Sequence, residues 1–84
     1  DSSTWIMEKR VAPELVILYR GDKFLVNTYH AIVAPPGATP GRDTAEQFIA
    51  YVASPDGQKI IGEYGRDRFG EGLYNDAAYA RQYD

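Results

Sequence analysis

The segment from residue 43 to residue 65 constrains the fold of this chain most, because it reads as two consecutive helices joined by a Ser-Pro step. Asp43 and Glu46 have the spacing of a capping box, which marks a helix start. Apolar residues then recur at intervals of three and four, the period of one helical face. We expect this stripe, which continues in the second helix, to be core: Ala45, Phe48, Ile49, Val52, Ile60 and Ile61.

The signals around the second helix are equally specific. Ser54 is a favourable N-cap residue, and Pro55 fits the first helical turn. Gly65 suits the C-terminal end. Residues 35–42 hold three prolines and two glycines and therefore predict a loop. A short helical turn is also expected after Ser2, closed off before Pro13.

Three apolar runs lie before that loop, at residues 15–19, 24–26 and 29–34. The first is continuous and rich in β-branched residues, which is typical of a strand covered on both faces. These runs predict an α/β fold with a mixed β-sheet and a C-terminal helix pair. Such a sheet needs more neighbours than the chain offers, so we expect part of the core to come from elsewhere.

Composition excludes several classes of protein. The chain has 84 residues and a net charge of −3, which lacks the basic footprint of a nucleic-acid-binding domain. It has no cysteine, and His30 is its only histidine, so the sequence predicts no disulfide, no zinc site and no other cofactor. No nucleophile and base are placed together by a motif, and we therefore predict that it is not an enzyme.

Several segments resemble one family. Residues 48–61, Phe-Ile-Ala-Tyr-Val-Ala-Ser-Pro-Asp-Gly-Gln-Lys-Ile-Ile, are similar to the C-terminal helix pair of bacterial solute-binding proteins. Residues 27–35 resemble the Asn-Pro-Tyr-Gly segment of tungstate-type oxyanion receptors, and residues 15–22 their strand that ends in Gly-Asp. Residues 1–5 and 73–77 resemble further segments, in the same order. The chain thus looks like the C-terminal segment of a tungstate/molybdate-like substrate-binding protein of an ABC transporter.

This resemblance implies a periplasmic-binding-protein-like fold of type II, with two α/β lobes and the ligand between them. Residues 1–34 would form the end of lobe two and the return crossing strand. Residues 35–84 would form the C-terminal helices and a tail packing on lobe one. The chain would be a fragment of a larger receptor, completed by the remaining N-terminal part or by a second chain.

The function implied by the resemblance is that of an extracytoplasmic solute-binding subunit of an ABC importer. It would capture a small solute, an oxyanion such as tungstate or molybdate, and deliver it to an ABC permease in the membrane. The implied location is the periplasm or the extracellular face of a bacterium, after export directed by a signal peptide that this chain does not contain. No nucleic acid would take part.

Five residues are the candidate ligand-binding set. The hydroxyls of Ser2, Ser3 and Thr4 could meet an anion at a helix start, although plain N-capping is the alternative. Asn27 and Tyr29 could lie at the crossing between lobes, with packing at a strand edge as the alternative. The family has an arginine where this chain has Ser2 and a glycine where it has His30, so another anion or small solute stays open.

A different class of function is the alternative to transport. The incomplete sheet favours a small stand-alone α/β protein-interaction module, which folds alone or as a strand-swapped dimer and uses an open sheet edge.

Overall fold

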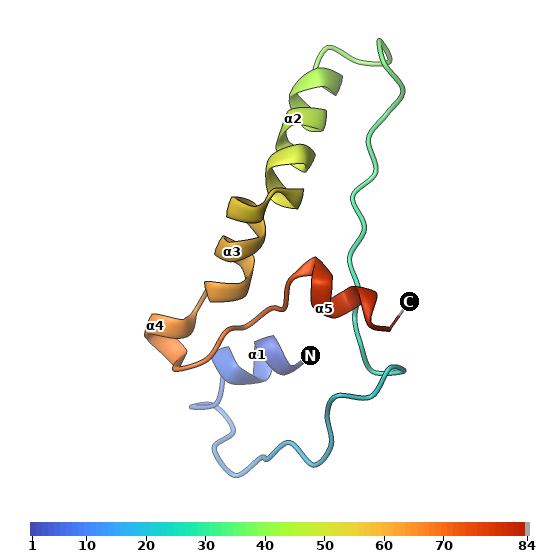
Figure 1. Ribbon diagram of the computed structural model, residues 1–84. Coiled ribbons are helices and arrows are strands. Elements are labelled where there is room, and N and C mark those ends of the chain that lie inside the picture. The colour runs from blue at the N-terminus through green and yellow to red at the C-terminus, as the bar shows by residue number, and fades with distance from the viewer. Residues whose placement is uncertain (84) are drawn as a thin grey trace.

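Helices account for all the regular structure in the computed structural model, which describes residues 1–83 (Figure 1). Within those residues there is no β-strand. The mixed sheet and α/β fold predicted from the sequence are therefore wrong for this chain, and the two-lobe arrangement built on them is not supported. The five helices are α1 (Ser2–Met7), α2 (Arg42–Ala53), α3 (Pro55–Glu63), α4 (Arg66–Phe69) and α5 (Ala77–Arg81).

The α2–α3 pair confirms the predicted helix pair bent at the Ser-Pro step. Ser54 has extended backbone angles (φ −68°, ψ 160°), and its Oγ accepts a hydrogen bond from the N–H of Gly57 at 3.2 Å. Pro55 occupies the first turn of α3, where no intrahelical donor is needed. Gln58 donates from Nε2 to the carbonyl oxygen of Val52 at 2.7 Å, which fixes the bend from the other side.

The start of α2 differs from the capping box that we predicted. Gly41 is the N-cap residue, and Asp43 lies inside the first turn. Glu46 does not reach back to a backbone N–H; it pairs with the guanidinium of Arg42, which also contacts Asp43 at 3.3 Å. Arg42 donates to the carbonyl oxygen of Ala34 at 3.0 Å as well, so this one side chain joins the helix start to the end of the preceding segment.

The three apolar runs expected to be strands form no ladder. The N–H of Leu15 closes a turn. Among residues 1–83, no backbone N–H of residues 16–24 donates a hydrogen bond to a backbone carbonyl. The trace then rises beside α3 and α2 in the opposite direction and turns at the loop before α2 (Figure 1). A strand exists only when a neighbour pairs with it, and within the described residues these runs have none.

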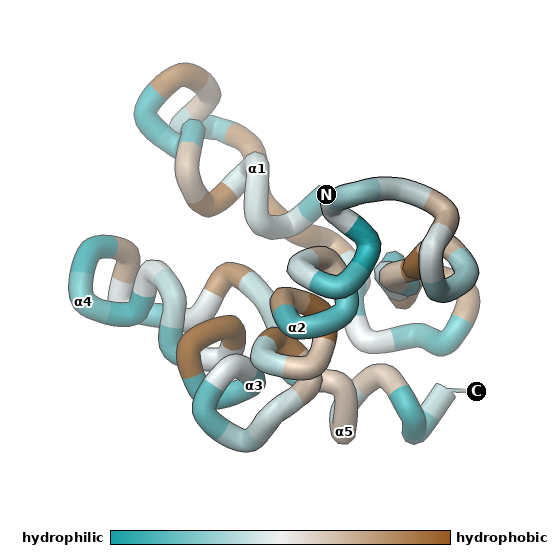
Figure 2. The backbone as a smooth tube through the Cα atoms, turned by 90° about the horizontal axis from the view of Figure 1, so that it is seen from above, coloured by the Kyte–Doolittle hydropathy of each residue, from teal (hydrophilic) through white to brown (hydrophobic). Residues whose placement is uncertain are grey.

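Burial also departs from the sequence prediction. Ile6 and Leu73 are the only buried hydrophobic residues within the described part of the chain. The predicted core stripe lies in water or is only half-covered: Phe48 is 67% exposed and Ile60 56%. Figure 2 shows hydrophobic stretches on the outlying loop next to α1 as well as along α3. An amphipathic helix buries its stripe only if another layer covers it, and that layer is missing here.

The dimensions agree with this open arrangement. The radius of gyration is 16.2 Å and the molecule measures 52 × 27 × 22 Å. A compact domain of this length would have a radius of about 12 Å. The predicted boundary at residue 34 falls where the rising segment meets the turns before α2. Among the described residues, no helix combines the length and the hydrophobicity that a membrane crossing requires.

Candidate functional site

A groove of about 1000 Å³ is lined by parts of the chain that are distant in sequence. The start of α1, the rising segment, α3 and the C-terminal tail all contribute to it. Its lining residues include, from these parts in turn, Asp1, Ser2, Arg20, Asn27, Tyr29, His30, Gln58, Ile61, Leu73, Asp76 and Tyr79. Three of the five candidate residues, Ser2, Asn27 and Tyr29, therefore face one common space.

A short polar network occupies one end of the groove. Asn27 donates from Nδ2 to Oδ2 of Asp1 at 3.4 Å and to the phenol oxygen of Tyr29 at 3.1 Å. The other carboxylate oxygen of Asp1 accepts from the N–H of Ser3 at 3.1 Å and from its hydroxyl at 3.2 Å. Asp1 is thus the acceptor on which the amide and the hydroxyl converge, and it connects α1 to the rising segment.

Ser3 and Thr4 lie outside the groove. Asp1, and not a serine, is the N-cap residue of α1, and its carboxylate accepts from the N–H of Ser3. Ser3 is buried and its hydroxyl donates to the same oxygen, so neither group of Ser3 is open to a ligand. Thr4 is exposed on the next position of α1. Because the carboxylate of Asp1 already accepts from the first turn of α1, an anion would meet repulsion at that helix start.

Charged residues of both signs line the groove. Arg20 brings a guanidinium and His30 an imidazole, whereas Asp1 and Asp76 bring carboxylates. Sequence reasoning did not select Arg20, although it directly precedes the Gly-Asp pair of the resemblance. It also did not select Asp76 or Tyr79, and no local signal could have done so, because only the return of the tail places them here.

The tail carries a tyrosine pair beside the groove. The rings of Tyr79 and Tyr83 lie 5.4 Å apart, and the hydroxyl of Tyr83 donates to that of Tyr79 at 3.5 Å. This hydrogen bond raises the pKa of the Tyr83 phenol above its ordinary value, with smaller contributions from partial burial and from the charges of Tyr79 and Asp22. The raised pKa keeps the Tyr83 phenol neutral at physiological pH.

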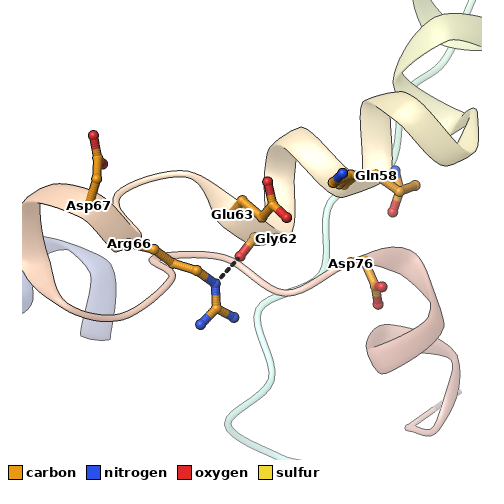
Figure 3. Close-up of a pocket in the computed structure, with 7 residues that line it drawn as sticks. Gln58, Gly62, Glu63, Arg66, Asp67 and Asp76 are labelled. Atoms are coloured by element: carbon orange, nitrogen blue, oxygen red, sulfur yellow. Dashed lines mark hydrogen bonds between the residues drawn. The ribbon is translucent and has the colours of Figure 1, made fainter.

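A second hollow of about 680 Å³ lies along α3 and α4 (Figure 3). Its lining alternates in charge, with Lys59 and Arg66 against Glu63, Asp67 and Asp76. Arg66 donates from Nε to the carbonyl oxygen of Gly62 at 3.2 Å, so its guanidinium is held at the end of α3. Because basic and acidic side chains are mixed along this hollow, its lining indicates no particular class of ligand.

No group of three or more metal-ligating side chains occurs in residues 1–83. Comparison of the chain with models of known protein families, with curated proteins and with solved structures found no match. The resemblance to oxyanion receptors therefore depends only on the motifs at residues 1–5, 15–22, 27–35, 48–61 and 73–77.

Proposed function

We propose that this chain is part of an extracytoplasmic solute-binding protein of an ABC importer and helps to capture a small oxyanion, such as tungstate or molybdate. The observation that carries the proposal is the groove. Ser2 comes from one motif of the resemblance and Asn27 and Tyr29 from another, and the three residues line one space. Ligand sites are concave and hold a few convergent polar groups, and this groove has both properties.

Arg20 supplies the cation that such a ligand needs. The family arginine is replaced by Ser2 in this chain, and Arg20 lines the same groove as Ser2. A guanidinium can donate two parallel hydrogen bonds to two oxygens of one anion. We therefore assign to Arg20 the neutralisation of the anion and to the hydroxyl of Tyr29 its orientation. Asn27 donates its two amide hydrogens to Asp1 and to the Tyr29 oxygen, so its role is to position the Tyr29 hydroxyl.

The proposed capture is reversible binding of the anion, and no covalent bond is made or broken. The groove is still wet, because Tyr29 is 75% exposed. Hydrogen bonds from the groove to a ligand become stronger when water is excluded. The remaining part of the receptor, or a second chain, would therefore cover the ligand. The loaded receptor would then pass the anion to a membrane permease at the outer face of a bacterial membrane.

The test is calorimetric titration of the gene product that contains this chain with tungstate, molybdate, sulfate and phosphate. We expect one of these anions to bind and Arg20→Gln to weaken that binding by about tenfold or more, because a charged hydrogen bond is lost. Arg10→Gln removes the same charge from an exposed site outside the groove and should leave the affinity unchanged.

The outcomes separate the parts of the proposal. A gene product that binds none of the four anions contradicts the assignment to oxyanion capture. Binding that Arg20→Gln and Arg10→Gln leave equally intact contradicts the role of Arg20 but not the receptor function.

A further inference from the structure

Residues 14–20, Glu-Leu-Val-Ile-Leu-Tyr-Arg, combine an apolar centre with opposite charges at the two ends. The hydrophobic side chains lie in water, with Leu18 92% and Val16 71% exposed. From Val16 to Arg20 no backbone N–H donates to a backbone carbonyl of residues 1–83. An apolar, β-forming run with free backbone groups is a template for pairing with another chain.

The order of residues in this run is self-complementary. If two copies are placed antiparallel with Ile17 opposite Ile17, then Glu14 of each copy faces Arg20 of the other. The positions between them match apolar residues with apolar residues: Leu15 faces Tyr19, and Val16 faces Leu18. Opposite charges and aromatic–aliphatic pairs directly across an antiparallel ladder stabilise it.

We propose that residues 14–20 pair with the same residues of a second copy of this chain, as an antiparallel two-stranded ribbon centred on Ile17. The contact is isologous, so the same patch serves both copies and the assembly closes at two. Pro13 and Gly21 flank the run at equal distances from Ile17 and end the ladder on both sides.

The terminal charges exclude the competing arrangements. Parallel in-register stacking, the arrangement of many fibrils, would place Glu14 on Glu14 and Arg20 on Arg20, which is repulsive. An antiparallel register displaced by two residues in one direction brings Glu14 opposite Asp22, and in the other direction opposite Leu18. Of these arrangements, only the register centred on Ile17 forms two Glu14–Arg20 ion pairs, one at each end of the ribbon.

Pairing also sorts the side chains into two faces, because successive residues of a strand point to opposite sides. One face consists of Leu15, Ile17 and Tyr19 from each copy and is apolar except for the hydroxyl of Tyr19, which donates to Asp22 at 3.3 Å. The other has Val16 and Leu18 at its centre and the two ion pairs at its ends. A two-stranded ribbon is marginal alone, so we expect association to be weak and to depend on concentration.

The first test is sedimentation of the 84-residue chain over a range of concentrations. We expect a monomer–dimer equilibrium, and we expect Glu14→Arg or Arg20→Glu to raise its dissociation constant by about tenfold. The double variant Glu14→Arg/Arg20→Glu restores both ion pairs in exchanged positions and should dimerise like the original chain. Asp67→Arg makes the same charge change as Glu14→Arg on the exposed side of α4 and is the matched control.

The second test reads the register directly, because the chain has no cysteine. Ile17→Cys places two thiols opposite each other at the centre of the ribbon, within the Cα separation that a disulfide bridges. Mild oxidation should then yield a covalent dimer. Ile32→Cys, at a side chain that is 92% exposed but outside the run, should yield much less.

A chain that stays monomeric at its solubility limit overturns the proposal, and so does a double charge variant that fails to recover association. Growth beyond the dimer, unaffected by the single charge variants, would identify unspecific stacking and would overturn it as well. The inference shares Arg20 with the proposed anion site. The dimerisation tests contain no anion, and Glu14→Arg and Ile17→Cys change residues outside the groove, so failure of the dimer and failure of anion capture are distinguishable.

Discussion

Gly57 packs against the backbone at the end of α2, and the lack of space for a Cβ atom explains why a glycine stands there. It is buried in the first turn of α3. A Cβ atom at this position would meet the carbonyl oxygens of Tyr51 and Val52, the second at 2.8 Å. Backbone atoms cannot move aside as a flexible side chain can. Gly62, in the same helix, has nothing within 4 Å of such a Cβ atom.

These two glycines predict opposite effects of the same substitution. Gly57→Ala should destabilise the α2–α3 bend by about 1–3 kcal/mol, because the clash outweighs the gain in helix propensity. Gly62→Ala should stabilise α3 by up to about 1 kcal/mol, because only propensity changes. Circular dichroism would detect a lower helix content in the first variant and a higher one in the second. Equal behaviour of the two variants would contradict the close approach at Gly57.

At the scale of elements, Gln58 holds the tail against the helix pair. Its Nε2 donates to the carbonyl oxygen of Val52, and its Oε1 accepts from the N–H of Ala77, each at 2.7 Å. Ala77 is the first residue of α5, which Asp76 caps through its carboxylate. One amide side chain therefore connects three helices, and it positions the tail that lines the groove.

Removal of this amide should free the tail. In Gln58→Ala we expect faster hydrogen exchange at the Ala77 amide, by about five- to tenfold, since a net hydrogen bond contributes about 1 kcal/mol. Gln58→Glu keeps an acceptor for Ala77 but loses the donor to Val52, so its exchange at Ala77 should stay closer to that of the original chain. Nuclear magnetic resonance measures the exchange rate of the Ala77 amide in both variants. Unchanged exchange at Ala77 in the alanine variant would contradict the bridge.

At the scale of the whole molecule, the chain buries too little to hold itself together. Ile6 and Leu73 are the only buried hydrophobic residues of the described part. Two buried side chains are too few to offset the conformational entropy that a chain of this length loses on folding. The indole N–H of Trp5 is also buried without an acceptor among residues 1–83. A stable fold of this chain would require another layer over the exposed apolar surface.

We therefore expect the dilute 84-residue chain to lose helix gradually on heating, without one sharp transition. The near-ultraviolet dichroism of Trp5 should be weak, because its surroundings are not fixed by a packed core. Covering the apolar surface should sharpen the transition. The cover can be the rest of the gene product or a second copy of the chain at high concentration. A cooperative calorimetric transition in dilute solution would contradict this expectation.

Local chemistry made α1 and the α2–α3 pair predictable. Helix caps, proline position and the helical period act within a few residues, so Ser54 and Pro55 marked the bend that the structure contains. The capping box predicted at Asp43 was wrong, although it also rested on local chemistry. The side chain of Asp43 is able to cap a helix, but Glu46, the second member of the predicted box, forms an ion pair with Arg42 instead. Asn27 and Tyr29 were selected from the motif of residues 27–35. Arg20 lies within the motif of residues 15–22, but nothing in that motif indicates that it lines the same groove as Asn27 and Tyr29.

The apolar runs show where local information ends. The order of residues 15–19 is enough to predict a hydrophobic segment suited to a strand. A strand is a pairing between segments, however, and the described chain holds no partner for this one. The exposure of the predicted core stripe, and the groove shared by the start of α1, Asn27 and the tail, arise only in the folded chain. Burial and convergence depend on which surfaces meet, and no spacing within a single segment contains that information.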